Sequence, residues 1–157
     1  MNIQHLSKKA GNILAKKRMT LAVAESCTGG MIGVAITDVP GSSRYFPGGV
    51  IAYDNRIKRS VLKVPQATLD RHGAVSGQTV IAMARGVKRL FKTDCAIAVS
   101  GVAGPDGGTK DKPVGLVYIA VVARNIAKKY ECSFSGTRAG IRRQTVEESL
   151  WRLIRLL

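Results

Sequence analysis

The sequence predicts an α/β domain of three layers, α/β/α, in which helices cover both faces of one sheet. Three observations lead to this expectation. Apolar runs of strand length occur five times, and between them lie segments whose apolar residues recur at helical spacing. The third observation is size, because 157 residues, 45% of them hydrophobic, suit one domain with a proper core. We therefore expect a single domain over residues 1–157.

The predicted helices are amphipathic or bounded by helix signals. Segment 3–18 should turn its lysines to water, and segment 31–36 should stop near Thr37, before a turn-rich loop. Ser76 is a natural N-cap for a helix that runs to about Phe91. That helix should bury five apolar residues, namely Val80, Met83, Ala84, Val87 and Leu90. Further helices are expected at 54–62, 67–71 and 140–157.

The five apolar runs predict the strands. They span residues 20–24, 49–53, 95–100, 116–123 and 128–134. The last two should form a hairpin that turns at Arg124 and Asn125. Between the third and the fourth lies the glycine-rich segment 101–113, and a loop of that length usually carries function.

Charge is the strongest compositional signal. The chain has 25 Lys and Arg against 10 Asp and Glu, a net charge of +15, which favours anionic partners, with nucleic acid the obvious candidate. The cations are nevertheless scattered over the predicted helices, and they lack the interleaved aromatic rings of a single-strand binder. We therefore favour a solvated basic surface over a nucleic-acid site. The best segment for a weak anionic contact carries Lys8, Lys9, Lys16, Lys17 and Arg18.

Cysteine, histidine and hydropathy patterns limit the class of protein. The apolar runs are far shorter than the roughly 20 residues that cross a bilayer, so no membrane contact is expected. The three cysteines are widely spaced, which indicates free thiols in a reducing cytoplasm. The two histidines have no Cys or carboxylate at a recognised ligand spacing. We expect neither a metal nor a cofactor.

Ser26 follows the first predicted strand directly and precedes a helix. Its hydroxyl should be exposed there, with the free amides of Thr28, Gly29 and Gly30 pointing into the same space, an arrangement that suits an oxyanion. The Gly-x-Ser-x-Gly spelling of the nucleophile elbow is absent. In the alternative interpretation, which the pattern alone favours, Ser26 or Thr28 merely caps the helix.

Cys27 competes with Ser26 for the role of nucleophile, because a thiol at a helix N-terminus can have a lowered pKa. Neither histidine is placed by the sequence to serve it, and small cysteines are commonly buried. We interpret Cys27 as a packing residue.

Lys58 follows the second predicted strand and should lie at the same edge of the sheet as Ser26. Its cationic neighbours Arg56 and Arg59 would help to keep it neutral, as a general base requires, although an exposed helical lysine is the simpler alternative. The glycine-rich loop offers amides to a phosphate, with Lys110 and Lys112 adding charge, but it lacks the Walker spelling. The residues alone therefore predict an anion-binding α/β domain with a candidate serine nucleophile.

Six stretches of the chain resemble the signature blocks of the CinA C-terminal domain family, in order. They are residues 24–30, 37–43, 48–53, 72–76, 100–108 and 112–115. The resemblance implies an α/β/α sandwich with a mixed five-stranded sheet. Because stand-alone members of the family are nicotinamide-nucleotide amidohydrolases, it also implies deamidation of nicotinamide mononucleotide to nicotinate mononucleotide and ammonia, in pyridine nucleotide salvage. It further suggests a homodimer.

The resemblance also implies which residues form the site. The family's serine falls on Ser26 and its lysine on Lys58, and Tyr53 is similar to a third position at the chemistry. Residues expected to bind the substrate are Thr28, Gly29, Gly30, Ser100, Gly101, Gly104, Gly107, Gly108 and one of Arg142 and Arg143. Gly77 departs from the family, since a glutamate commonly stands there. The competing hypothesis is a non-catalytic module of the same fold that binds a nucleotide or nucleic acid.

Overall fold

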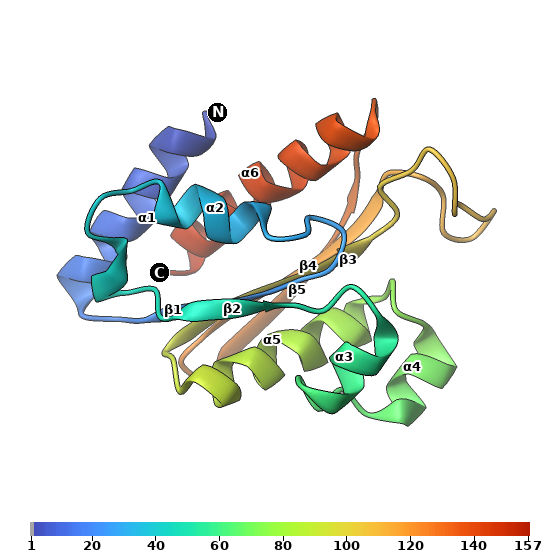
Figure 1. The fold of residues 1–157 in the computed structure, drawn as a ribbon, viewed down its shortest axis with the longest axis horizontal. Coiled ribbons are helices and arrows are strands. Elements are labelled where there is room, and N and C mark those ends of the chain that lie inside the picture. The colour runs from blue at the N-terminus through green and yellow to red at the C-terminus, as the bar shows by residue number, and fades with distance from the viewer. Residues whose placement is uncertain (1) are drawn as a thin grey trace.

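The computed structural model describes residues 2–157, and in them a five-stranded mixed sheet lies between two layers of helices (Figure 1). The strand order is β2-β1-β3-β4-β5. The strands are β1 (Leu21–Glu25), β2 (Gly48–Ile51), β3 (Cys95–Gly101), β4 (Leu116–Ala123) and β5 (Ile126–Ser133). Strands β2, β1 and β3 run parallel, whereas β4 and β5 are antiparallel to their neighbours. The predicted α/β/α class and the mixed sheet are confirmed.

Each face of the sheet carries its own layer of helices. One layer contains α1 (Ile3–Lys17), α2 (Met31–Thr37) and α6 (Arg138–Leu156), and the other contains α3 (Asn55–Ser60), α4 (Gln66–His72) and α5 (Gly77–Phe91). Alternation along β1 divides the core between them, because Leu21 and Val23 face the first layer, whereas Ala22 and Ala24 face the second. The alanines let α5 pack close to the sheet. Central β1 is buried throughout, whereas edge strand β5 alternates in burial.

Several element boundaries differ from the sequence predictions by one or two residues. Strand β2 ends at Ile51 instead of residue 53, because the carbonyls of Ala52 and Tyr53 accept hydrogen bonds from Lys58 instead of continuing a ladder. Strand β5 starts at Ile126, so the hairpin turns at residues 124 and 125, as predicted. Helix α6 starts two residues earlier than expected, at residue 138.

One core prediction on α5 is wrong. Leu90 was expected to face inward with Val80 and Val87, but it is 50% exposed. Phe91 packs against the core in its place. Eleven residues complete about three turns of an α-helix, so Phe91 returns to the face of Val80, whereas Leu90 is rotated away from it.

The helices of residues 2–157 are each too short or too polar to cross a bilayer.

Candidate active site

A cavity of about 220 Å³ opens at the carboxyl ends of the parallel strands β1 and β3. Ligands of open α/β sheets bind at this edge, because successive loops diverge there. The residues that line it are Ser26, Cys27, Tyr53, Asn55, Lys58, Ala74, Val75, Ser100, Gly101, Ala103 and Arg138. Of the predicted catalytic residues, the cavity brings together Ser26, Lys58 and Tyr53.

Ser26 is held by the sheet itself. Its amide donates to the carbonyl of Val99 at 3.1 Å, which extends the pairing of β1 and β3 by one residue. The side chain is 8% exposed and lines the cavity. The hydroxyl is therefore fixed at the point where the strand stops and the turn begins.

Lys58 is buried in spite of its charge and is only 1% exposed, so the alternative of an exposed helical lysine is wrong. It lies on α3, which Asp54 caps by accepting the amide of Arg56 at 2.7 Å. The Lys58 Nζ lies 3.1 Å from Ser26 Oγ, 2.7 Å from the Ala52 carbonyl oxygen and 3.1 Å from the Tyr53 carbonyl oxygen. The carboxyl end of β2 and the helix that follows it thus place the amine on the serine.

Burial lowers the pKa of Lys58 below its ordinary value, while the nearby Cys27 and Asp54 act in the opposite direction. The sequence hypothesis gave this role to the neighbouring cations Arg56 and Arg59. Both are exposed, and Arg56 is paired with Asp54, so desolvation replaces them as the cause.

The geometry suits a neutral Lys58 acting as a base. A neutral amine has two N–H bonds and one lone pair. In the neutral form, the carbonyls of Ala52 and Tyr53 would accept the two hydrogens, which would leave the lone pair for the hydroxyl of Ser26. A serine in contact with an uncharged lysine is the arrangement that an activated nucleophile needs.

Glu25 is a central residue of the site that sequence reasoning missed. Its carboxylate is 1% exposed and accepts four hydrogen bonds, from the Thr28 hydroxyl at 2.5 Å and from the amides of Gly30, Ile32 and Gly33 at 3.0, 3.1 and 2.8 Å. It thereby caps α2, whose own N-cap position is a glycine without a side chain. The signal was present in the sequence, because an acid just ahead of a glycine-started helix complements the free amides and the helix dipole.

The cap formed by Glu25 changes the predicted oxyanion site. Gly30 donates its amide to Glu25, and Gly29 donates its amide to the Ser26 carbonyl at 3.1 Å. The prediction of free amides is therefore wrong for these two glycines. None of these hydrogen bonds uses the amide of Thr28. This amide therefore remains the candidate donor to an oxyanion in the turn. Glu25, with the Thr28 hydroxyl bound to it, takes the capping role that was considered for Ser26.

Cys27 lines the cavity but is a poor nucleophile. Its side chain is buried, and burial raises the pKa of the thiol to about 11. A neutral thiol at physiological pH agrees with the interpretation of Cys27 as a packing residue.

Arg138 is the arginine that reaches the cavity, in contrast to the predicted Arg142 or Arg143. It donates to the Gly104 carbonyl at 2.7 Å and to the Tyr53 hydroxyl at 3.0 Å, which ties the loop after β3 to the mouth of the site. The prediction missed Arg138 because α6 was expected to start two residues later.

The two predicted arginines lie elsewhere. Arg142 donates to the Thr28 carbonyl at 2.8 Å and so supports the serine turn without lining the cavity. Arg143 is exposed and outside the cavity.

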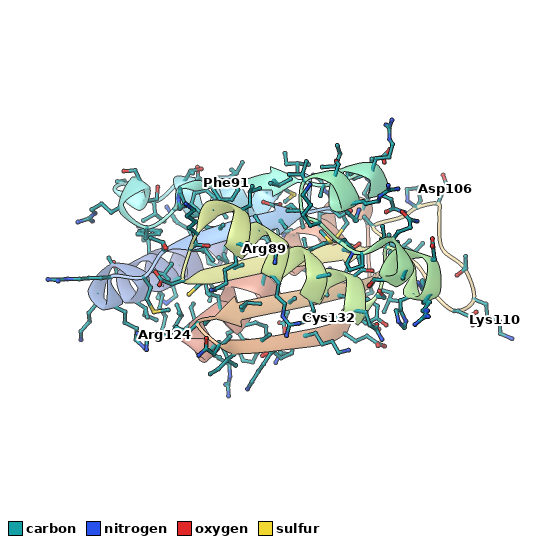
Figure 2. All side chains as sticks on the ribbon, turned by 90° about the horizontal axis from the view of Figure 1, so that it is seen from below. Arg89, Phe91, Asp106, Lys110, Arg124 and Cys132 are labelled. Atoms are coloured by element: carbon teal, nitrogen blue, oxygen red, sulfur yellow. The ribbon has the colours of Figure 1, made fainter. Side chains whose placement is uncertain are left out.

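The glycine-rich loop contributes only its first part. Ser100 and Gly101 line the cavity, and the Ser100 hydroxyl donates to the Ala74 carbonyl at 2.7 Å. Gly107 and Gly108 are exposed and do not line it. They belong to the loop that extends away from the sheet in Figure 1 and whose far part carries the labels Asp106 and Lys110 in Figure 2. The two glycines therefore lie outside the cavity, and their predicted contact with the substrate stays a prediction.

Metal ligands are not gathered anywhere in the described part of the chain, since no group of three or more His, Cys, Asp or Glu side chains has the required proximity.

Comparison with known proteins places the chain among relatives of the same architecture. The family model described as the CinA C-terminal domain matches residues 3–157. A CinA-like protein from Endomicrobium trichonymphae is 49% identical over 152 residues, which cover 97% of this chain and 36% of the relative. The chain thus spans little more than a third of the length of the curated relatives it matches.

Solved structures cover the chain more evenly. A competence/damage inducible protein from Agrobacterium tumefaciens is similar with a TM-score of 0.94 and 39% identity, covering 98% of this chain and 94% of that one. A competence damage-inducible protein A from Klebsiella pneumoniae has a TM-score of 0.96 and 33% identity, covering 99% and 96%. The family match over almost the whole sequence and these structural likenesses agree with the signature blocks, and the chain belongs to the CinA C-terminal domain family.

Proposed function

We propose that this chain hydrolyses the carboxamide of nicotinamide mononucleotide, with Ser26 as nucleophile and Lys58 as base. The observation that carries the proposal is the 3.1 Å contact between Lys58 Nζ and Ser26 Oγ, made by a buried lysine of lowered pKa. An exposed lysine would be protonated at neutral pH and could not accept a proton. The substrate class is the one that the resemblance to the CinA C-terminal domain family implies, and it belongs to the proposal.

In the first half of the reaction, neutral Lys58 takes the proton of the Ser26 hydroxyl as its oxygen attacks the carboxamide carbon. The carbonyl oxygen becomes an oxyanion, which the amide of Thr28 would stabilise. Protonated Lys58 then returns its proton to the departing nitrogen, and ammonia leaves an acyl ester on Ser26. The two carbonyls that hold the Lys58 amine keep it in place through both transfers.

In the second half, a water molecule attacks the ester while Lys58 again accepts a proton. The ester bond breaks, Ser26 regains its hydrogen, and the nicotinate product leaves. One amide and one water are consumed, and one carboxylic acid and one ammonia are formed.

The size of the cavity supports a pose in which only part of the substrate is enclosed. Sites for whole ligands usually measure roughly 300 to 1,000 Å³, and this cavity has about 220 Å³. We infer that the carboxamide ring enters it, while the ribose and phosphate remain at the mouth beside Arg138. The guanidinium there would form charge-assisted hydrogen bonds with the phosphate, each contributing about 1.5–3 kcal/mol.

The decisive experiment follows both products of purified protein with nicotinamide mononucleotide. We expect ammonia and nicotinate mononucleotide in equal amounts, and neither product from the Ser26→Ala variant measured at the same concentration. The non-catalytic alternative predicts heat of binding in a calorimeter for both proteins and no ammonia from either. That result would refute the hydrolase assignment.

A further inference from the structure

A basic groove lies at the end of the sheet opposite the cavity. It has a volume of about 710 Å³ and runs between the carboxyl end of α5 and the β4–β5 hairpin. Five cationic side chains line it, namely Arg85, Lys88, Arg89, Lys92 and Arg124. Figure 2 views the molecule from the α5 side and shows Arg89 and Arg124 well apart from Asp106 and Lys110, which mark the loop beside the cavity.

Folding creates this concentration of charge from segments that are far apart in the sequence. Three of these cations, Arg85, Lys88 and Arg89, lie on α5, and Lys92 is its C-cap. Arg85 lies three and four residues before Lys88 and Arg89, so the three helical cations share one face. The hairpin brings Arg124 to the same groove from a different part of the chain. The sequence alone suggests scattered cations because this meeting is tertiary.

The cations of the groove are without acidic partners. Within residues 2–157, no acidic side chain lines it, and none of its five cations takes part in a salt bridge. Asp94 follows the lining residue Thr93 in the sequence, and its carboxylate already accepts the amide and hydroxyl of Thr20. The groove therefore presents a concentrated positive potential that an anion from outside would neutralise.

The shape of the groove favours a long anion over a small one. A second hollow of about 500 Å³ adjoins it, shares Arg85 and Ala127 with it, and adds Lys129 and His72. Together they follow α5, whose 15 residues make a helix about 22 Å long. A track of this length exceeds a mononucleotide and suits a polymer with repeated negative charge.

We propose that this groove binds the phosphodiester backbone of a nucleic acid, independently of its sequence. Neither hollow is lined by a Phe, Tyr or Trp within residues 2–157, so His72 is the one ring that a base could meet there, and binding rests mainly on the phosphates. An anionic membrane is disfavoured because the surface is concave and lacks the row of apolar anchors that interfacial helices use. Leu90 is the single well-exposed large apolar side chain of α5.

The test is a salt titration of binding to a labelled 20-nucleotide single strand, followed by fluorescence anisotropy. The variant Arg85→Gln, Lys88→Gln, Arg89→Gln removes three groove cations, and the matched variant Lys8→Gln, Lys9→Gln, Lys16→Gln removes three exposed cations of α1. We expect the groove variant to bind at least about tenfold more weakly, with the slope of log affinity against log salt reduced by about 2. The α1 variant should stay within about twofold of the parent.

Three outcomes would overturn the proposal. The first is equal weakening of strand binding by both variants, which would mean a diffuse charge effect. The second is no binding of the strand at 50 mM salt. The third is preferential binding of phosphatidylserine vesicles or polyglutamate over the strand. Thermal melting confirms that the variants fold. The inference is independent of the proposed hydrolase, because the groove variant should keep full turnover and Ser26→Ala should keep full strand binding.

Discussion

The two ends of the sheet use positive charge in opposite ways. At the carboxyl end, Lys58 is buried against three oxygen atoms, and burial lowers its pKa. At the other end, the cations of the basic groove are turned to solvent, without ion pairs among the described residues. Burial favours the neutral form of a lysine, as the proposed mechanism requires of Lys58, whereas an exposed lysine keeps its charge. Effects at the first end should therefore be all-or-none, and effects at the second should be graded and sensitive to salt.

The largest expected effect comes from removing either member of the buried pair. Ser26→Ala and Lys58→Met should each reduce turnover of nicotinamide mononucleotide by at least about a thousandfold, because the two groups act as a unit. Methionine is preferred to alanine because it fills the buried volume, whereas Lys58→Ala would leave a cavity. Steady-state ammonia release measures the loss, and Cys27→Ala serves as the control that should retain most activity. An active Ser26→Ala variant together with an inactive Cys27→Ala variant would assign the role of nucleophile to the thiol.

The same pair gives a stability signature with a definite sign. Between its lowered folded pKa and its ordinary unfolded value, Lys58 binds fewer protons in the folded state than in the unfolded state. The free energy of unfolding therefore gains a contribution that rises with pH through that window. The difference in free energy of unfolding between parent and Lys58→Met, measured by denaturant titration at several pH values, should show this rise. A difference that stays flat with pH would show that burial leaves the pKa of Lys58 unchanged.

The spacing of apolar residues and the positions of helix caps and turn residues predicted the fold, because both are local features of the sequence. The five strands lie within two residues of their expected bounds, and the Ser76 cap and the two-residue hairpin turn were predicted correctly. The error at Leu90 arose because apolar spacing by threes and fours drifts from the true helical repeat over ten residues. Sequence reasoning could not foresee that Phe91 would complete the face.

The candidate site was less predictable because its members meet only in the folded chain. The meeting of Ser26 and Lys58 was predictable, because each residue follows the end of a strand and a parallel sheet brings these strand ends to one edge. The burial of Lys58 was not predictable, since a lysine gives no local sign that its partners will be buried carbonyls. The role of Glu25 had a local signal in its place just ahead of a glycine-started helix, and that signal was overlooked. Arg138 replaced its neighbours on α6 because the position of one helix start decides which side chain reaches the cavity.

The second expected effect tests whether buried charge at the carboxyl end also positions the nucleophile. Glu25→Gln replaces a carboxylate that accepts four hydrogen bonds with an amide that brings its own donors. The unfolding free energy should fall by about 3 kcal/mol, equivalent to a melting temperature about 6–12 °C lower. Measured while folded, kcat should drop by about tenfold with little change in KM, because Glu25 orders the turn without contacting substrate.

A matched control for Glu25 is Glu148→Gln, which removes a half-exposed pair with Arg152 on α6. Such pairs contribute about 0–1 kcal/mol, so its melting temperature and kcat should stay near those of the parent. If the Glu25 variant lost stability but kept kcat, the carboxylate would be a cap and nothing more.

The third expected effect lies at the mouth of the cavity, where charge is exposed but held by partners. Arg138→Gln should raise KM for nicotinamide mononucleotide by about tenfold while kcat changes by less than about threefold, because we place the guanidinium on the phosphate and away from the reacting amide. Arg143→Gln, on the same helix but outside the cavity, should change neither constant. A loss confined to kcat in the Arg138 variant would place that arginine at the chemistry instead.

The smallest expected effect separates the charge of a residue from its capping role. Asp54 caps α3 through the amide of Arg56, and its carboxylate also favours the protonated form of Lys58. Asparagine caps a helix about as well as aspartate, so Asp54→Asn should leave the melting temperature nearly unchanged. Removing the negative charge lowers the pKa of Lys58 slightly further.

The rising limb of turnover against pH should therefore move to lower pH, by a few tenths of a unit, since exposed charges are well screened. Asp54→Ala should give the same displacement and, in addition, lower the melting temperature, because alanine cannot cap the helix. A limb that moves to higher pH in Asp54→Asn would mean that the titrating group is not a lysine beside that carboxylate.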